Sequence, residues 1–449
     1  MKEVFLIVRA YYGVNIHSDA QGEYGTILDS NDVFPDLALI NAATILNNSN
    51  DYEVKVIDAV TDGPMLPDKL IKEIITYKYD KLIVKTTAPS FKSDLELIRQ
   101  IKKAKSHSYI MIAGQIAKVL KNWINENTDI DEVIDQPLDG YIYEYVHGRK
   151  ADIDDLPCPD YTLVNYKKYT DDNKNIRLTI QASRGCPMSC AYCPYIKYYE
   201  KIEYRSVDKV IDDIKALVSL GVDVIQFRDQ FFTCDKKRII EICNRIIQEN
   251  IKINWICETR LDSLDNELID LMKQAGMFLI CFGVESGNPE VLDSYNSDKG
   301  EADKQKEIIK YLNDKEIITM AFYIVGFPED TWESLFETYK YADYLDSKYA
   351  IFNEYTDFNY SNLNTLTPDI FNSFENTTKV GRDTFLSREE IRYIIGLFST
   401  MYTLKNDTLE KAYRYNYKLV KDSREVSSEI VKYENDLVKM SEIISSRCK

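Results

Sequence analysis

Apolar positions in the first 140 residues follow two alternating spacings. Short runs rich in β-branched residues predict strands at 4–10, 52–58, 80–86 and 108–114. Between these runs apolar residues recur every third or fourth position, which predicts helices at 34–48, 67–78 and 90–105. Such strand–helix alternation is typical of a parallel sheet with helices on both faces. Ligands of these sheets bind beyond the carboxyl ends of the strands, here the loops that begin at residues 58, 86 and 113.

A second alternating series follows a stretch rich in Asp, Pro and Asn that lacks periodicity and is typical of a linker. The predicted strands of this series are 176–183, 222–228, 253–259, 277–284 and 318–326. The predicted helices are 206–220, 235–249, 265–275, 302–314 and 331–345. This spacing indicates a full or partial β/α barrel, in which chemistry occurs at the carboxyl ends of the strands.

The pattern changes near residue 347. An aromatic and Asn-rich stretch begins with a strand-like piece, and 387–446 then predicts two or three charged amphipathic helices. We therefore expect an α/β chain in four parts: a Rossmann-like domain over 1–145, a linker over 146–175, a barrel over 176–346, and a mainly helical domain over 347–449. The aromatic stretch either supplies a substrate wall or simply closes the barrel core.

Composition and charge narrow the functional classes. The net charge of −17 disfavours nucleic-acid binding, because such affinity comes from neutralising phosphates, although a local basic patch stays compatible with it. No apolar run reaches the roughly 18 residues that span a bilayer, so no membrane partner is expected. The N-terminus is typical of a first strand and not of a signal peptide. We expect a cytoplasmic protein whose nine cysteines are thiols, metal ligands or catalytic groups.

Three cysteines lie within eight residues, Cys186-Pro-Met-Ser-Cys190-Ala-Tyr-Cys193, directly after a predicted strand. This crowding disfavours disulfides among them. Zinc sites normally combine two Cys pairs, or Cys with His pairs, and the chain has three histidines and no second CxxC pair. An iron–sulfur cluster normally takes four thiolates, so three would leave one iron open to an outside ligand. The alternative is three unrelated loop cysteines.

The segment CPMSCAYC resembles the CxxxCxΦC signature of radical S-adenosylmethionine (radical SAM) enzymes. The resemblance implies that Cys186, Cys190 and Cys193 hold a [4Fe-4S] cluster whose fourth iron is chelated by the amino and carboxylate groups of SAM. One-electron reduction then cleaves SAM to methionine and a 5′-deoxyadenosyl radical, which abstracts hydrogen from a substrate. It also implies that Tyr192 lies near the adenine.

Four downstream segments resemble later strands of the same family, and together with the cysteines they cover about residues 176–345. In VIQFRDQFFT, Asp229 would bind the SAM amine, the alternative being a loop-capping aspartate. In WICETRLDSL, Arg260 would face a carboxylate or the backbone, the alternative being a surface ion pair. In GVESG, Glu285 with Ser286 would bind the ribose or adjoining polar groups. In FYIVGFPEDT, the segment that contains Gly326 and Pro328 would close over the adenine.

The N-terminal region resembles the cobalamin-binding domain of cobalamin-dependent radical SAM enzymes. The similar pieces are FPDLALINAATIL, YEVKVIDA, TTAPSF and MIAGQIA, together with the linker segment DIDDLPCPDY. The resemblance implies a tentative cobalamin site at Asp58, Thr86, Thr87, Gly114 and Gln115. There is no DxHxxG motif, so no lower axial histidine is evident. The alternative is a domain that has lost its ligand and only supports the barrel.

These resemblances imply a cobalamin-dependent radical SAM enzyme of natural-product biosynthesis. The expected activity is C-methylation of an unactivated carbon of a small molecule or peptide, by way of the 5′-deoxyadenosyl radical and methylcobalamin. The expected redox partner is a one-electron donor such as flavodoxin or ferredoxin. Two alternatives stay open: a non-methylating rearrangement, cyclisation, epimerisation or C–C bond formation, with or without cobalamin, and a non-catalytic iron–sulfur or cobalamin carrier. No further catalytic residue is assigned.

Overall fold

The computed structural model describes residues 2–28, 30–63, 65–199, 201–356, 367–368 and 388–405. The chain divides into two compact units. The described part of unit 1 is mainly Met1–Thr259 with Glu267–Phe278, and that of unit 2 is Arg260–Asn266 and Leu279–Thr356 with the helix at 388–405. Each unit is described by itself.

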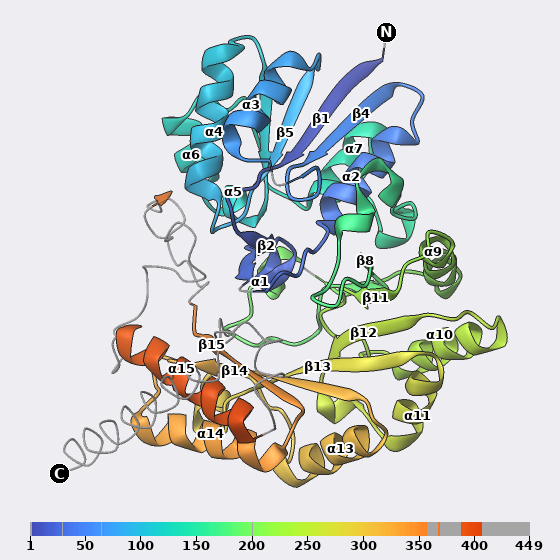
Figure 1. Ribbon diagram of the computed structural model, residues 1–449, viewed down its shortest axis with the longest axis vertical. Coiled ribbons are helices and arrows are strands. Elements are labelled where there is room, and N and C mark those ends of the chain that lie inside the picture. Colours follow the sequence, from blue (N-terminus) through green and yellow to red (C-terminus); the bar gives the residue numbers. More distant parts are fainter. Residues whose placement is uncertain are drawn as a thin grey trace. The chain divides into compact units, whose positions relative to one another are not determined.

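The N-terminal part of unit 1 is a five-stranded parallel sheet in the order β4-β1-β5-β6-β7 (Figure 1). Its strands are β1 (Glu3–Arg9), β4 (Tyr52–Asp58), β5 (Lys81–Lys85), β6 (Tyr109–Ala113) and β7 (Glu132–Ile134). Its helices are α2 (Leu37–Asn47), α3 (Pro67–Thr76), α4 (Phe91–Ala104), α5 (Gln115–Val119), α6 (Lys121–Asn127) and α7 (Leu138–His147). The predicted Rossmann-like sheet is confirmed.

Alternation along the strands explains how this sheet is buried on both faces. Leu6, Val8, Leu82 and Val84 belong to one fully buried cluster with residues of α3 and α4. Successive strand residues point to opposite faces, so Phe5 and its alternating neighbours face the other side, where α2 and α7 lie (Figure 1). Burial on both faces also explains why these strands are continuous apolar runs in the sequence.

A short antiparallel hairpin that the sequence pattern did not predict lies between β1 and α2. It consists of β2 (Asn15–His17), the single helical turn α1 (Ala20–Glu23) and β3 (Thr26–Leu28). Strands of three residues are too short to show a period of two, which explains why the pattern missed them. The linker that follows α7 holds only three 3₁₀ turns, η1 (Ile153–Asp155), η2 (Tyr161–Leu163) and η3 (Tyr166–Lys168).

The second sheet has six strands in the order β15-β14-β13-β12-β11-β8, as expected of a partial barrel. Its strands are β8 (Arg177–Ile180), β11 (Val224–Phe227), β12 (Asn254–Thr259), β13 (Met277–Glu285), β14 (Ile318–Val325) and β15 (Tyr349–Glu354). In unit 1, β11 pairs in parallel with both β8 and β12, and in unit 2, β14 pairs in parallel with both β13 and β15.

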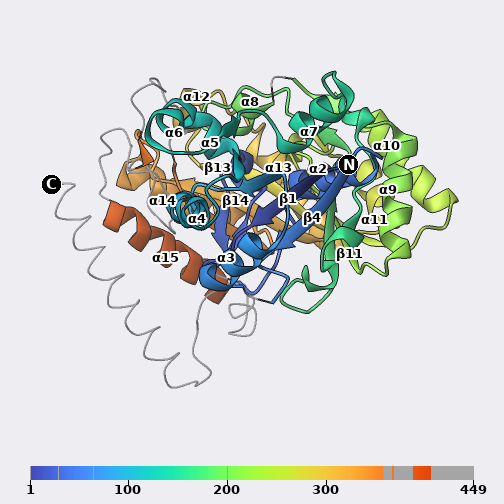
Figure 2. The same cartoon turned by 90° about the horizontal axis from the view of Figure 1, so that it is seen from above.

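Helices alternate with these strands as the spacing predicted. They are α9 (Val207–Ser219), α10 (Lys236–Gln248), α11 (Asn266–Gln274), α12 (Pro289–Ser294), α13 (Ala302–Asp314) and α14 (Trp332–Leu345). The short helix α12, between β13 and α13, was not predicted. Figure 2 shows α9 and α10 side by side, as Figure 1 does. Each carries apolar residues on one face, because their buried positions recur at helical spacing.

The C-terminal region is described only in part. Helix α15 (Arg388–Lys405) packs against β15 and α14 in unit 2, with Phe398 near both Phe352 and Phe336 (Figures 1 and 2). This helix is the first of those predicted for 387–446, and the remainder of that prediction lies outside the described residues. No helix in the described ranges is long and apolar enough to cross a membrane.

Candidate functional site

The three clustered cysteines lie in one loop of unit 1, between β9 (Ser183–Arg184) and α8 (Tyr195–Tyr198). The loop follows the carboxyl end of β8, where barrel chemistry is expected. Strand β9 pairs with β10 (Glu203–Tyr204) at the base of the loop. Gly185 starts the loop with a φ of +85°, and a Cβ there would lie 2.3 Å from the carbonyl oxygen of Lys201. Only glycine fits this turn.

The loop cysteines are thiols in the described structure. None of them is in a disulfide; Cys190 is buried, and Cys186 and Cys193 are partly exposed. No three His, Cys, Asp or Glu side chains of the described ranges converge so as to hold one metal ion. The thiolates of an iron–sulfur cluster bind different irons and need not converge on one point. The assignment of the three cysteines to a cluster therefore stays a prediction.

Two side chains at the end of β11 hold the entrance of this loop. The carboxylate of Asp229, which is 2% exposed, accepts the Ala182 amide at 2.8 Å and the Ser183 hydroxyl at 2.5 Å. Burial raises the pKa of Asp229 to about 6, although these hydrogen bonds oppose the shift. The side-chain carbonyl of Gln230 accepts the Gly185 amide at 2.8 Å. Asp229 thus has the geometry of the loop-capping alternative, and its role toward the SAM amine stays a prediction.

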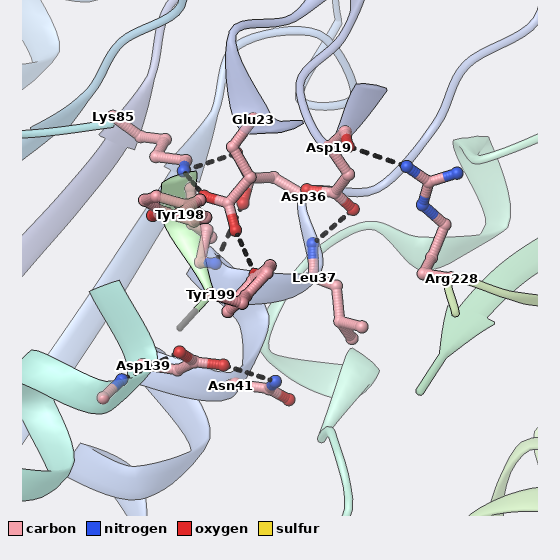
Figure 3. Close-up of polar contacts among 12 residues, drawn as sticks. Asp19, Glu23, Asp36, Leu37, Asn41, Lys85, Asp139, Tyr198, Tyr199 and Arg228 are labelled. Carbon is pink, nitrogen blue, oxygen red and sulfur yellow. Dashed lines mark hydrogen bonds and ion pairs between the residues drawn. The ribbon is translucent and has the colours of Figure 1, made fainter. Parts of the chain in front are cut away.

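Helix α8 and the strand before the loop also contact residues that the sequence did not single out, and Figure 3 shows Glu23 with Tyr198 and Tyr199. Tyr198 and Tyr199 donate hydrogen bonds to Glu23, and Arg184 pairs with Asp139 at 2.5 Å. No local motif identifies Glu23 or Asp139, because each meets its partner only through the tertiary fold. Tyr192, the predicted adenine neighbour, lies in the loop between Cys190 and Cys193 and is partly exposed.

Apart from Asp229, the predicted SAM residues of the later strands lie in unit 2. Glu285 ends β13 with a φ of +70°, and its carboxylate accepts Lys299 Nζ at 3.2 Å. The Ser286 hydroxyl lies 3.1 Å from the Thr338 hydroxyl. Ser286 and Lys299 line a cavity of about 190 Å³ together with the backbone of Gly287. A cavity of this size holds only part of a drug-sized ligand.

Two other predicted residues of unit 2 have contacts that bear on their roles. Arg260 pairs with Asp262 at 2.5 Å and donates to the carbonyl oxygen of Asp298 at 2.6 Å, which is the ion-pair alternative that the sequence left open. Gly326 has a φ of +90°, and its amide donates to the buried carboxylate of Asp330 at 2.9 Å. Pro328 follows in the same turn and is partly exposed.

The predicted cobalamin residues lie at the carboxyl edge of the N-terminal sheet, and three of their side chains are already engaged within the protein. Asp58 pairs with Arg9 at 2.6 Å and accepts the Tyr169 hydroxyl at 2.5 Å. The Thr86 hydroxyl donates to Asp94 at 2.6 Å. The Thr87 hydroxyl lies 2.8 Å from that of Ser90.

The last two residues of this set have features that suit a ligand. Gly114 has a φ of +141°, and a Cβ there would lie 2.3 Å from the Thr86 carbonyl oxygen, so the backbone of the two loops approaches as closely as glycine allows. Gln115 is 3% exposed, and its side-chain oxygen is buried with no hydrogen-bond partner. Buried polar atoms are normally paired. Within this predicted set, the Gln115 oxygen is therefore the acceptor that could serve a polar ligand such as a corrinoid amide group.

Comparisons with known proteins agree with this layout. Residues 180–342 match the model of the Radical SAM superfamily. An uncharacterized methyltransferase of Pyrococcus horikoshii is 32% identical over 203 residues, which span 44% of this chain and 44% of that protein. An anaerobic magnesium-protoporphyrin IX monomethyl ester cyclase of Cereibacter sphaeroides is 33% identical over 197 residues, 42% of this chain and 32% of that protein. The match thus spans less than half the length of these relatives.

Two solved structures share the fold. The radical SAM methyltransferase TsrM of Kitasatospora setae, solved with tryptophan substrate and a SAM analog, has a TM-score of 0.61 at 15% identity over 78% of this chain and 73% of its own. The cobalamin-dependent radical SAM enzyme OxsB, solved with aqua-cobalamin and SAM, has a TM-score of 0.57 at 16% identity over 76% of this chain and 52% of its own. At this identity the likeness concerns the fold.

Proposed function

We propose that the chain is a cobalamin-dependent radical SAM C-methyltransferase, because residues 180–342 match the model of the Radical SAM superfamily. Its substrate is a small molecule or peptide with an unactivated carbon. The observation that carries the proposal is that three cysteine thiols lie in one loop beyond the carboxyl end of β8. A Rossmann-like sheet precedes this loop in the chain. TsrM and OxsB, which combine the same fold with cobalamin or SAM chemistry, support it.

The chain's own residues have defined tasks in this proposal. When bound, the cluster, SAM and cobalamin supply one-electron chemistry, a radical source and a methyl carrier. Cys186, Cys190 and Cys193 bind three irons of the cluster. Gly185 gives the loop its tight turn, and Asp229 holds the strand that enters it. These contacts fix the loop before a cofactor binds, which limits reorganisation during the reaction.

The remaining assignments are part of the same proposal. Tyr192 would contact the adenine of SAM, and the turn with Gly326 and Pro328 keeps its predicted role of closing over the adenine. Glu285 and Ser286 bind the ribose, while Arg260 orients backbone or carboxylate groups nearby. At the N-terminal sheet, Gly114, Gln115, Thr86 and Thr87 would hold cobalamin. Asp58 supports that edge through Arg9. A cytoplasmic one-electron donor, such as flavodoxin or ferredoxin, supplies the reducing electron.

A non-methylating radical reaction is the second candidate, and the naming of the Cereibacter relative as a cyclase favours keeping it. The two are distinguished by anaerobic reconstitution of the chain with iron, sulfide and hydroxocobalamin, followed by SAM and dithionite. A methyltransferase yields S-adenosylhomocysteine in an amount that depends on added cobalamin. A non-methylating enzyme yields 5′-deoxyadenosine and methionine alone. If a chain that holds its cluster yields none of these products, both radical reactions are contradicted. The carrier alternative is then left.

The cysteine assignment has its own control. Replacement of Cys186, Cys190 and Cys193 by Ala should remove bound iron and both SAM-derived products. The matched control is Cys243→Ala, because this cysteine is buried in α10 and burial raises its pKa to about 12, so it stays a thiol. Iron that persists in the triple variant, or disappears in the control, contradicts the assignment.

A further inference from the structure

The hairpin between β1 and α2 carries an unusual backbone turn that points one carboxylate inward. Gln21, Gly22 and Glu23 have φ values of 51°, 66° and 64°. L-residues rarely adopt this left-handed conformation, and such strain persists only where the surroundings enforce it. Glu23 is nevertheless 5% exposed. The turn therefore places a charged side chain in the interior of unit 1, where it requires partners.

The partners of Glu23 come from two parts of unit 1 (Figure 3). One oxygen accepts Lys85 Nζ at 3.0 Å and the Tyr198 hydroxyl at 2.9 Å, and the other accepts the Tyr199 hydroxyl at 2.8 Å. Lys85 is the last residue of β5, whereas both tyrosines are at the end of α8, five and six positions after Cys193. One carboxylate thus joins the N-terminal sheet to the segment that leaves the cysteine loop.

The three side chains that donate hydrogen bonds to Glu23 keep their protons. Burial acts to lower the pKa of Lys85, but attraction by Asp36 and Glu23 outweighs it, so the net shift is upward and the ammonium stays charged. Burial, followed by the nearby Glu23 carboxylate, raises the pKa of Tyr198 and Tyr199 well above the ordinary value. Both phenols therefore stay protonated and donate to Glu23.

Direct packing strengthens the same connection. A Cβ added to Gly22 would lie 3.0 Å from the Cβ of Pro194, the residue that follows Cys193. The Tyr195 hydroxyl donates to the backbone oxygen of Asp19 at 3.0 Å. The turn α1 thus contacts the chain from the residue after the last cysteine to the end of α8.

The segment that enters the cysteine loop has a separate attachment to the same sheet domain. Arg184, two residues before Cys186, pairs with Asp139 of α7 at 2.5 Å, and Asn41 of α2 donates to the same carboxylate at 3.1 Å. Asp139 is fully buried. Burial acts to raise its pKa, but the Arg184 guanidinium outweighs this and lowers it, so the pair stays ionised.

We propose that Glu23 and Asp139 are positioning residues through which the N-terminal sheet domain holds both ends of the cysteine loop and sets the spacing of its three thiolates. This inference rests on the proposed function for the cluster itself. It assigns the N-terminal domain a task that is independent of any corrinoid: neither residue is a cluster ligand in the proposal, and each acts through residues that flank the loop. Partners of this kind orient metal ligands, and their loss weakens metal retention.

The test uses the full chain and the variants Glu23→Gln, Asp139→Asn and Tyr199→Phe. Each protein is reconstituted anaerobically with iron and sulfide, and iron per chain is followed during exposure to a chelator. We expect iron loss to accelerate by about tenfold or more in Glu23→Gln and Asp139→Asn, and to a smaller extent in Tyr199→Phe. The electron paramagnetic resonance spectrum of the dithionite-reduced cluster, with and without SAM, should change in the same order.

Tyr169→Phe is the matched control, since it also removes a buried phenol–carboxylate hydrogen bond, to Asp58, far from the cysteine loop in sequence. It should lower thermal stability but leave iron retention and the spectrum unchanged. If Glu23→Gln and Asp139→Asn fold and match the wild type in both readouts, the inference is wrong and the proposed function is untouched. If either variant fails to fold, the inference is judged on Tyr199→Phe. Iron retention and a spectrum that match the wild type in this variant make the inference wrong. A wild-type chain that binds no iron overturns the proposed function and this inference together.

Discussion

Replacement of Asp58 by Asn distinguishes a structural carboxylate from a cofactor contact. Asp58 and Arg9 are opposite residues of β4 and β1, 1% and 5% exposed, and they form two hydrogen bonds of 3.0 and 2.6 Å. The Tyr169 hydroxyl adds a third at 2.5 Å. Asparagine keeps the shape but removes the counter-charge that is hydrogen-bonded to the buried guanidinium, so that Asp36 is left as a negative charge acting on it without a hydrogen bond. Removing one partner of a buried ion pair costs about 3–5 kcal/mol.

This loss of folding free energy lowers the melting temperature, Tm. For a unit of more than 150 residues, each kcal/mol lowers Tm by about 2–4 °C, so Asp58→Asn should lower Tm by roughly 6–20 °C. The measurement is a thermal melt of the apoprotein followed by circular dichroism, with hydroxocobalamin titrated separately at a temperature where both proteins are folded. Corrinoid affinity should stay within about threefold of wild type, because the carboxylate is turned to Arg9 and Tyr169.

The double variant Arg9→Met with Asp58→Leu is the control, because apolar replacement of both partners is often neutral or stabilising. It should recover most of the lost Tm. The reasoning is refuted if Asp58→Asn melts within about 2 °C of wild type and loses corrinoid binding. That result would identify Asp58 as a ligand contact and the ion pair as secondary.

Three further substitutions test other parts of the fold. Gly114→Ala places a methyl group 2.3 Å from the Thr86 carbonyl oxygen at a φ of +141°, so it should lower Tm and weaken hydroxocobalamin binding in a titration. Asp94→Asn should flatten the decline of Tm between pH 4 and 6: burial raises the pKa of Asp94 from 3.8 to about 6, so the folded state holds this proton more tightly and loses stability as pH rises through that window. Gly326→Ala places a methyl group 2.6 Å from Ile391 in unit 2 and should lower Tm and SAM affinity in equilibrium dialysis.

Each of these has an outcome that contradicts it. A Gly114→Ala protein with wild-type Tm would show that the two loops separate readily. An Asp94→Asn protein with the same pH profile as wild type would show that this carboxyl group is already ionised at pH 4. For Gly326→Ala, unchanged Tm with unchanged SAM binding would mean that Ile391 moves aside at little cost. The matched control for both glycine variants is Gly63→Ala, where a Cβ meets nothing within 4 Å.

The regular elements were predictable because buried positions recur with the period of a helix or a strand, and this period is visible in the sequence. Helix α13 spans Ala302–Asp314 as predicted, and those strands of the two sheets that had predicted bounds lie within a few residues of them. The hairpin was not predictable, since its turn depends on Gln21 and Glu23 adopting φ values that their residue types do not favour. Short elements such as β7 and α5 carry too few residues to display a period.

The candidate site was predictable only where its chemistry is local in sequence. The cysteine loop is one segment of eight residues, so its spacing alone indicates the cluster. Contacts between distant residues had no such signal: Glu23 meets Tyr198 across 175 positions, and Asp58 meets Tyr169 across 111. For the same reason the sequence could not tell whether Asp58 faces a ligand or another side chain. Arg260 shows the same limit, since only the fold brings Asp298 to it.

A substitution of Gln115 distinguishes two hypotheses: that the N-terminal domain binds a ligand, and that it only supports the barrel. Its side-chain oxygen is buried without a hydrogen-bond partner, and such an unpaired acceptor costs about 1–3 kcal/mol. Gln115→Leu should therefore raise the Tm of the apoprotein, because the apolar side chain removes that cost at similar volume. If the oxygen serves a corrinoid amide, the same variant should bind hydroxocobalamin about tenfold more weakly, since a bound polar group would lose its acceptor. A stabilised variant with unchanged corrinoid affinity would instead mean that the orphaned oxygen serves no ligand, and the supporting role would then be the better account of this domain.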